Sequence, residues 1–518
     1  MTADLDPRTP VVVGVGQASE RLDDPGYRGL SAVGLAAAAA RAALVDTGAD
    51  PDAAAGAVDV VAAIRQFEIS IPGATAPLGR SDNPPRSVAA RVGAHPRRAI
   101  LEVVGGQGPQ HLLTEMAATI AAGGCEAALI VGSEAISTVR HLAGSDDPPD
   151  FTEHAEGDLE DRGFGLEGLI SESLLVHGLG DMPAQYALFD HARRTRQGAS
   201  RTAYAHGMGA LFAPFTAVAA RNPHAAAPVE RTADELATPG GRNRMIADPY
   251  PRFLVSRDQV NQGAAALVVS VATARRLGVP ADRWVFLHGH CDLRERDLLD
   301  RPELSTSPAA VAAAREALAM AGVDVDDLAT LDLYSCFPIA VSTVADALGL
   351  AADDPRGLTL TGGLPFFGGA GNNYSMHAIA ETVAALRARP GAFGFVGANG
   401  VALSKYSAGV YSTRPAAWRP GDDAAVQARL DAAPAGPATA ARADGVGTVE
   451  TWTVRHGSGG GDGRRGIVVG RLDDGRRFLA TTEDDDTATL DLLGAGEPAG
   501  ARVRVRSTEH GNRVTVGD

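Results

Sequence analysis

Arg41-Ala-Ala-Leu44, followed by Gly48, recurs as Arg315-Glu-Ala-Leu318, followed by Gly322. The offset is 274 residues at both points. Each copy predicts an alanine-rich helix that ends at a glycine and leads into an apolar strand. A repeat this long exceeds the roughly 20–50 residues of a solenoid unit. It indicates that one α/β half-fold is used twice.

The repeat continues into Gly-rich stretches that each follow a strand and are followed by a helix and a further strand. The strands are continuous apolar runs, which is typical of a sheet covered on both faces. Their order with the helices predicts a mainly parallel sheet. In the first copy the segments are Val58–Ile64, Ala99–Val104, Gly105-Gly-Gln-Gly108 and Ala127–Gly132; in the second they are Leu328–Tyr334, Leu358–Thr361, Gly362-Gly363 with Gly368–Gly371, and Phe393–Gly397.

Size and charge exclude several classes of protein. The chain has 518 residues, which favours about three domains. It contains no apolar run of about 18 residues that would span a membrane. The net charge of −16 disfavours nucleic acid as the main partner, because a polyanion is bound by a basic surface. The first residues have neither a basic region nor an apolar signal core. With only three cysteines, which cannot all pair with one another, we expect the protein in a reducing cytoplasm.

Few residues offer metal-binding or amine chemistry. The three cysteines, Cys125, Cys291 and Cys336, lack the spacing of metal ligands and cannot all pair with one another. His288 and His290 share one face of a predicted strand while Cys291 faces the other, so no metal site is predicted. Lys405 is the only lysine and therefore the one side-chain amine for Schiff-base chemistry. We expect it to be a surface residue in a strand or turn.

The composition divides the chain into five parts. Residues 138–241 form a polar insertion with helical segments, which we expect to cap one face of the double sheet. An Ala-, Pro- and Asp-rich stretch with at most a short helix predicts a linker. The remaining residues alternate like short strands and predict a small β-barrel. The predicted boundaries are 1–137 with 242–282 for the first half, 138–241 for the cap, 283–414 for the second half, 415–446 for the linker and 447–518 for the barrel.

The predicted barrel contains Gly447-Thr-Val-Glu-Thr-Trp-Thr-Val454 and Gly466-Ile-Val-Val-Gly-Arg-Leu-Asp-Asp-Gly475. These stretches resemble the OB-fold domains found with acyl-CoA enzymes. OB-folds also bind single strands through aromatic side chains in a basic groove, but this one offers only Trp452 and Phe478. We therefore favour a protein contact or a stabilising role over nucleic-acid binding. Seven arginines are candidates for an exposed basic face: Arg464, Arg465, Arg476, Arg477, Arg502, Arg504 and Arg506.

The first Gly-rich loop joins a strand to a helix, with Pro109 at the helix start. Glycines at such a join let the backbone approach a ligand, and a helix N-terminus favours negative charge. A cysteine there would have a lowered pKa. No cysteine or serine stands in Gly105–Gly108. The alternative interpretation is a tight turn that only packs helix on sheet.

These segments, in their order, resemble the thiolase superfamily and most of all its sterol-carrier-protein-2-type, thiolase-like branch. The resemblance covers about residues 10–414 and includes Gly105-Gly-Gln-Gly-Pro-Gln110, Gln262-Gly-Ala-Ala-Ala266 and Tyr334-Ser-Cys-Phe337. It implies a five-layered α/β/α/β/α fold with a coenzyme A tunnel. It also implies acetyl-CoA acetyltransferase-type chemistry in lipid metabolism and, by family, a homodimer.

The family's catalytic groups are a cysteine nucleophile, a histidine that activates it, a second cysteine or histidine, and an Asn or His of the oxyanion hole. This sequence departs at each matching position, where Gly105, Gly369, Ala398 and Tyr334 stand instead. Without a nucleophile and a base the covalent route is closed.

Other residues are candidates to replace them or to bind ligand. His377 lies one turn into a predicted helix, where a solvated or capping role is expected, and Cys336 has a packing role as the alternative. The candidate substitutes are His111, Cys336, Tyr374 and His377, and the candidate residues of a CoA pocket are Gly106, Gly108, Gly362, Gly363, Gly371 and Asn372.

Three functions follow as hypotheses. The first is binding of CoA or an acyl-CoA thioester without thiolase chemistry, with no covalently bound cofactor. The second is an active acyltransferase with relocated catalytic residues. The third is a non-catalytic scaffold for a partner acyl-CoA enzyme, with the barrel as the contact to a protein partner.

Overall fold

The chain is described from a computed structural model that covers residues 5–457 and 463–517. Residues 1–4, 458–462 and 518, which fall in the predicted first half and barrel, lie outside the described residues.

The first half is built on a six-stranded sheet in the order β1-β8-β4-β2-β3-β5. β2, β3 and β4 run parallel, and β8 lies antiparallel between β1 and β4. β4 and β8 are buried along their whole lengths, as their unbroken apolar sequences predict. The strands are β1 (Pro10–Ser19), β2 (Val60–Ala63), β3 (Arg98–Leu101), β4 (Ala127–Ala135), β5 (Glu160–Asp161) and β8 (Asn261–Ser270).

The second half repeats this plan with fewer strands. Its sheet has the order β10-β11-β12-β9, with β10 and β11 parallel and β12 antiparallel between β11 and β9. β9, β10, β11 and β12 therefore correspond to β1, β2, β4 and β8. The bounds are β9 (Phe286–Arg294), β10 (Leu328–Asp332), β11 (Phe393–Gly400) and β12 (Lys405–Ser412).

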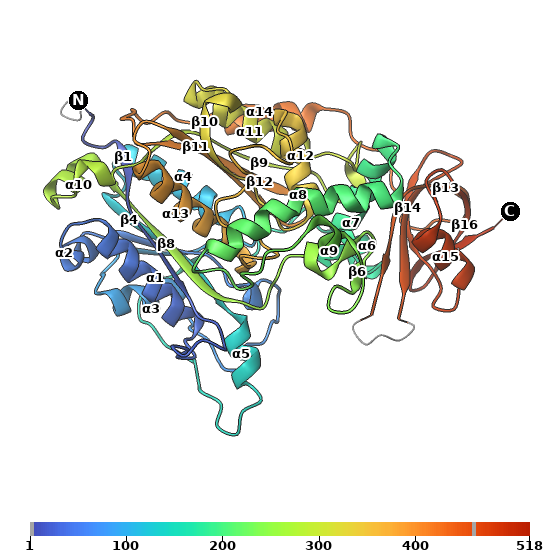
Figure 1. Ribbon diagram of the computed structural model, residues 1–518, viewed down its shortest axis with the longest axis horizontal. Coiled ribbons are helices and arrows are strands. Elements are labelled where there is room, and N and C mark those ends of the chain that lie inside the picture. Colours follow the sequence, from blue (N-terminus) through green and yellow to red (C-terminus); the bar gives the residue numbers. More distant parts are fainter. Residues whose placement is uncertain (1–4, 458–462, 518) are drawn as a thin grey trace.

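The two sheets lie in a stack of five layers, which confirms the predicted fold (Figure 1). α1 and α3 cover the outer face of the first sheet, and α11 covers that of the second, with α12 packed beside α11. α4 and α13 contact strands of both sheets and so form the middle layer. The helices are α1 (Ala32–Asp46), α2 (Pro51–Gly56), α3 (Pro84–Val92), α4 (Gly108–Ala121), α5 (Ile136–Leu142), α10 (Val271–Arg276), α11 (Pro308–Ala321), α12 (Pro338–Leu348) and α13 (Tyr374–Arg387).

The expected strand at Leu358–Thr361 is wrong, because this segment is a loop. The buried carboxylate of Asp332 accepts hydrogen bonds from the amides of Leu360 and Thr361 and from the Thr359 hydroxyl, at 2.8–3.1 Å. A side chain therefore satisfies backbone groups that a strand would pair in a ladder.

The insertion contains the helices of the cap and one strand of the first sheet. β5 pairs with β3, so part of the predicted cap extends that sheet. α7 packs against α12, and α8 packs along α9. The helices are α6 (Glu172–Val176), α7 (Met182–Gln197), α8 (Arg201–Arg221) and α9 (Ala233–Ala237). After the insertion, β6 (Met245–Ala247) and β7 (Tyr250–Pro251) extend the sheet of the C-terminal strands.

The C-terminal strands form a closed five-stranded barrel in the order β14-β15-β17-β16-β13, closed by pairing of β13 with β14. Trp452 is fully buried in its core. The predicted linker contains an ordered helix, α14 (Asp423–Ala432), that packs on β9. The barrel elements are β13 (Gly445–Arg455), β14 (Arg465–Leu472), β15 (Arg477–Thr481), α15 (Thr487–Ala495), β16 (Arg502–Thr508) and β17 (Gly511–Val516).

The barrel packs on the cap and on the second half (Figure 1, red). β6 pairs with the end of β13. The hydroxyl of Thr453 donates to the carbonyl of Asp248, and Arg201 donates to the carbonyl of Gly496 at 2.8 Å. Trp452 stacks on His191 with a centroid distance of 4.3 Å. These contacts fix the position of the barrel on the rest of the chain.

The expected exposed face of seven arginines is wrong at Arg477, whose side chain is fully buried. Its guanidinium pairs with Glu450 at 2.6 Å and donates to the carbonyl oxygens of Leu299 and Arg301. Other arginines of this set are surface residues paired with acids, for example Arg476 with Asp474. Arg477 therefore joins the barrel to the second half.

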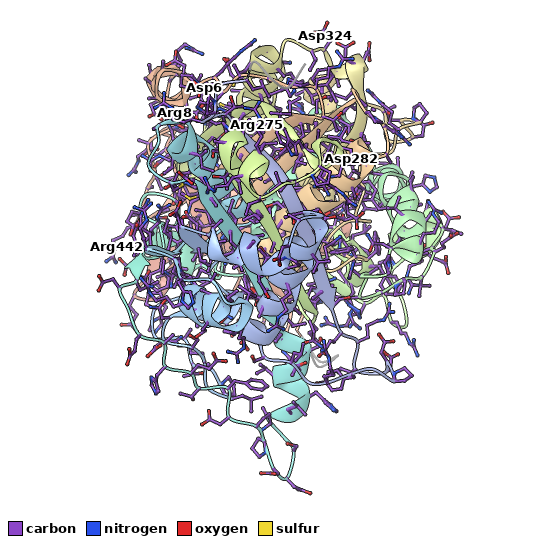
Figure 2. All side chains as sticks on the ribbon, turned by 90° about the vertical axis from the view of Figure 1, so that its left-hand side faces the viewer. Asp6, Arg8, Arg275, Asp282, Asp324 and Arg442 are labelled. Atoms are coloured by element: carbon purple, nitrogen blue, oxygen red, sulfur yellow. The ribbon has the colours of Figure 1, made fainter. Side chains whose placement is uncertain are left out.

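The opposite end of the molecule carries exposed charged side chains, among them Asp6, Arg8, Arg275 and Asp282 (Figure 2). Among the described residues, no helix combines the length and the apolar character needed to cross a membrane.

Candidate functional site

The loop Gly105–Gly108 connects β3 to α4 at the middle layer. Gly105 has φ +136°, a backbone conformation that favours glycine. A Cβ on Gly105 would overlap Oε1 of Gln107, whose side chain folds back over the loop. The Gly105 amide donates to Oδ1 of Asn372 at 3.0 Å, and Nδ2 of Asn372 donates to the carbonyl of Arg65. Asn372 therefore holds the loop in place.

Tyr334 covers the next residue of the loop. A Cβ on Gly106 would overlap the Tyr334 hydroxyl and would lie 2.7 Å from the carbonyl oxygen of Asn399. The ring of Tyr334 is buried and meets that of Tyr374 edge-on, with a centroid distance of 5.3 Å. The space over the loop backbone is therefore filled by protein. Ala398 precedes Asn399 on β11, so the structure brings three of the four family-equivalent positions to one region.

The fourth such position, Gly369, packs on a different segment. Its amide donates to the carbonyl of Arg257 at 2.7 Å. The candidate CoA-pocket glycines likewise face protein atoms, and the absence of a side chain permits these close approaches. Gly108 faces Ile64, Gly362 faces the Ala219 backbone, Gly363 faces Phe215, and Gly371 faces Glu134.

Two of the candidate substitutes lie on α13 and are fully buried. Nδ1 of His377 lies 2.7 Å from Oε1 of Gln17, and burial together with His224 lowers the pKa of His377 to about 3. The imidazole is therefore neutral, and the expected solvated or capping role of His377 is wrong. The Tyr374 hydroxyl pairs with Thr361, and burial raises its pKa well above the usual value.

His111 is the candidate substitute that borders an open cavity. It lies on the first turn of α4, and Nδ1 is 3.4 Å from the carboxylate of Asp292. Burial alone would lower the pKa of His111, but Asp292 raises it to about 9, with smaller contributions from Glu102 and Glu115. His111 is therefore protonated at neutral pH and is an acid rather than a base.

The cavity beside the loop has a volume of about 430 Å³. Five separate parts of the chain form it: the end of β3 with the loop and α4, Gly165 of the insertion, the end of β9, the start of β12, and α14 from the predicted linker. Lys405 is in a strand, as expected, but it is partly buried and lines this cavity instead of the outer surface. The lining includes Glu102, Gln107, His111, Asp292, Arg294, Lys405 and Asp423.

Sequence reasoning did not find Gln107, Arg294, Asp292 or Asp423 as members of one site. The nearest signal was the position of Gln107 within the Gly-rich loop. Oε1 of Gln107 is buried and has no hydrogen-bond partner among the described residues. An orphaned buried acceptor of this kind calls for an explanation such as a water or a ligand.

One cluster next to the cavity has the composition of a metal site. Glu102, His111 and Glu115 offer ligand atoms that lie within 4.8 Å of one another. Arg162 donates to Glu102 at 2.8 Å and to both oxygens of Glu115. The guanidinium thus supplies the positive charge that a cation would otherwise supply.

The three cysteines provide a test of the remaining candidate nucleophile. All are free and buried; burial raises the pKa of Cys125 to about 11 and that of Cys336 to about 12. Because the thiolate is the reactive form, we expect no reaction of the native protein with a thiol reagent such as DTNB. All three thiols should react after denaturation in guanidinium chloride. Rapid native labelling of Cys336 would contradict this prediction and restore it as a nucleophile.

Comparison with solved structures shows the same architecture in several proteins. A monomeric SCP2-thiolase like protein type 1 from Mycobacterium smegmatis is 49% identical, with 99% of this chain and 100% of that chain covered and a TM-score of 0.85. Acetyl-CoA acetyltransferase from Syntrophomonas wolfei is 17% identical, covers 78% of this chain over 99% of its own, and has a TM-score of 0.54. Human mitochondrial 3-ketoacyl-CoA thiolase in complex with CoA is 17% identical over 78% of this chain and 98% of its own, with a TM-score of 0.54.

No curated protein sequence matches the chain. Residues 425–510 match the family model described as the thiolase-like protein type 1 additional C-terminal domain. This match covers most of α14 and the barrel from β13 through β16, and it ends just before β17. The identity to the M. smegmatis protein extends over nearly the whole of both chains. The chain therefore belongs to the family of SCP2-thiolase-like proteins of type 1.

Proposed function

We propose that this protein binds CoA or an acyl-CoA thioester without carrying out the thiolase reaction. The strongest support is that other side chains fill the space over Gly105 and Gly106. Gln107 and Tyr334 occupy the place where a nucleophilic side chain on either glycine would stand. A thiolase needs a thiolate at this helix N-terminus and a base beside it.

The cavity next to the loop supports the binding part of the proposal. Its volume of about 430 Å³ lies within the roughly 300–1,000 Å³ of ligand pockets. Its cations are His111, Arg294 and Lys405, which suit a polyanion such as CoA. Two of its carboxylates are already paired, Glu102 with Arg162 and Asp292 with His111. Thiolase-fold relatives include an enzyme solved with CoA.

The test is a thiolysis assay with acetoacetyl-CoA and CoA, run beside calorimetric titration of CoA on the same preparation. We expect stoichiometric binding and turnover equal to the uncatalysed background. Arg294→Gln should weaken CoA binding about tenfold, because one charge-assisted contact is lost. Arg442→Gln, an exposed arginine outside the cavity, is the matched control and should bind CoA as the unaltered protein does.

Each other outcome counts against a defined part of the proposal. Brisk thiolysis that is lost in His111→Ala would replace it with the acyltransferase hypothesis. Neither binding nor turnover would overturn the CoA part and favour the scaffold hypothesis.

A further inference from the structure

Lys405 is the only lysine in a chain that carries 47 basic side chains of the Lys and Arg types. It is the first residue of β12 and lines the 430 Å³ cavity. Nζ donates a hydrogen bond to the carbonyl oxygen of Val104 at 2.9 Å, directly before the Gly-rich loop. This contact fixes the amine at the cavity wall while leaving the lone pair of its neutral form free.

The Lys405 amine lacks the carboxylate partner with which a buried lysine is ordinarily paired. Among the described residues, no carboxylate lies within the 4.0 Å of an ion pair with Nζ. Glu102 and Glu167 act on it from further away, and Glu102 is already paired with Arg162 at 2.8 Å. Burial lowers the pKa of Lys405 to about 8, and Arg294 acts in the same direction. A substantial fraction of the amine is therefore neutral, and thus nucleophilic, near physiological pH.

Two further side chains of the cavity complement an amine nucleophile. Arg294 also lines the cavity, and among the described residues its guanidinium has no ion-pair partner within 4.0 Å, so it is available to a carboxylate. His111 is protonated and can donate a proton. An amine, an acid and a free cation around one cavity are the groups that bind and condense with an anionic carbonyl compound.

We propose that Lys405 forms an imine with the carbonyl group of a small oxo acid bound in this cavity, with Arg294 holding the carboxylate. The amine nitrogen attacks the carbonyl carbon, so that a C–N bond forms. The hydroxyl of the resulting carbinolamine takes a proton from His111 and leaves as water. One nitrogen proton passes to the carbonyl oxygen to make that hydroxyl, and the C–O bond breaks as water leaves. The second nitrogen proton returns to His111, and no electron donor or acceptor is needed. This inference goes beyond CoA binding and does not depend on it.

The test uses the full chain with pyruvate as the anionic probe, methyl pyruvate as its neutral counterpart, and cyanoborohydride to reduce the imine. Peptide mass spectrometry should detect an adduct whose added mass equals the mass of the ligand less one oxygen atom. Because Lys405 is the only lysine, the chain's α-amino group is the internal standard. We expect saturable labelling of Lys405, at least about tenfold faster at pH 7.5 than that of free Nα-acetyl-lysine, whose pKa is about 10.4. Labelling should rise with pH through about 8, as the amine loses its proton.

Two variants separate the roles. Lys405→Arg keeps the charge and should show no adduct in the peptide that contains residue 405, with an unchanged melting temperature as the check on folding. Arg294→Gln should reduce pyruvate labelling about tenfold and change methyl pyruvate labelling less than about twofold.

The proposal would be overturned if Lys405 were labelled no faster than Nα-acetyl-lysine, or if its labelling rose linearly with probe concentration without saturation. If Arg294→Gln reduced labelling by pyruvate and by methyl pyruvate to the same extent, the assigned role of Arg294 would be overturned. A failure of CoA to bind would leave these results unaffected.

Discussion

Replacing Arg477 with alanine is expected to lower the free energy of unfolding of the barrel and its docking surface by about 3–5 kcal/mol. The side chain is fully buried and joins three partners: the carboxylate of Glu450 and the carbonyl oxygens of Leu299 and Arg301. Removing it leaves the two carbonyl acceptors without their donor, and it leaves Glu450 with only Arg471, 3.5 Å away, as an ion-pair partner. Unpaired buried groups of this kind are costly because water cannot replace the lost partner.

The matched control is Arg476→Ala, one residue earlier in the chain. Arg476 pairs with Asp474 at the surface, where ion pairs contribute little. We expect its unfolding curve to superimpose on that of the unaltered protein. The measurement is urea unfolding followed by tryptophan fluorescence, since Trp452 lies in the barrel core. Superimposable curves for Arg477→Ala as well would mean that the barrel is not held to the second half through this residue.

Contacts between α14 and β9 explain why composition alone could not place the predicted linker against the second half. Residues 415–446 have the Ala- and Pro-rich composition of a linker, yet Asp423 accepts a hydrogen bond from the Asp292 amide and Gln427 pairs with the Arg294 backbone. α14 thereby becomes a wall of the cavity. Such contacts join residues more than 100 positions apart, and composition carries no information about them.

More of the fold than of the site could be predicted, because helices and strands are indicated by local sequence patterns. The paired alanine-rich helices with Gly48 and Gly322, and the unbroken apolar strands, predict two similar half-folds covered on both faces. The segment at Leu358–Thr361 has an apolar-threonine pattern that also suits a strand. What decides against the strand is the buried Asp332, whose carboxylate binds the amides of that segment. This contact spans about 28 residues and leaves no local signal.

The site depends on contacts between residues far apart in the chain, and the spacing of residues in the sequence does not reveal such contacts. The absence of cysteine and serine from Gly105–Gly108 is visible in the sequence. That Tyr334 covers Gly106 is not, because the two lie in different half-folds. Lys405 illustrates the opposite error: a single polar residue at a strand start favours a surface position, but this side chain is partly buried and lines the cavity together with α14 and the loop.

The second large effect is expected at Gly106, where alanine should lower the free energy of unfolding by about 3 kcal/mol. A Cβ there overlaps the Tyr334 hydroxyl and lies 2.7 Å from the backbone oxygen of Asn399, so the loop or β11 must shift. Forcing extra atoms into a packed core typically costs about 1–3 kcal/mol, and a backbone obstacle yields less than a side chain does. Gly56→Ala is the control, since nothing lies within 4 Å of that position. It should leave stability unchanged or raise it slightly.

A double-mutant cycle with Tyr334→Ala tests whether Tyr334 itself fills the space over the loop. If it does, Gly106→Ala should cost less in the Tyr334→Ala background than alone, by at least about 1 kcal/mol, because neighbouring substitutions couple by roughly 0.5–3 kcal/mol. The measurement is denaturant unfolding of the four proteins. Strict additivity would mean that the Asn399 backbone, not Tyr334, limits the space. In that case Tyr334 could not be what takes the place of a nucleophilic side chain at Gly106, and the proposed loss of thiolase chemistry would depend on Gln107 and on the missing cysteine alone.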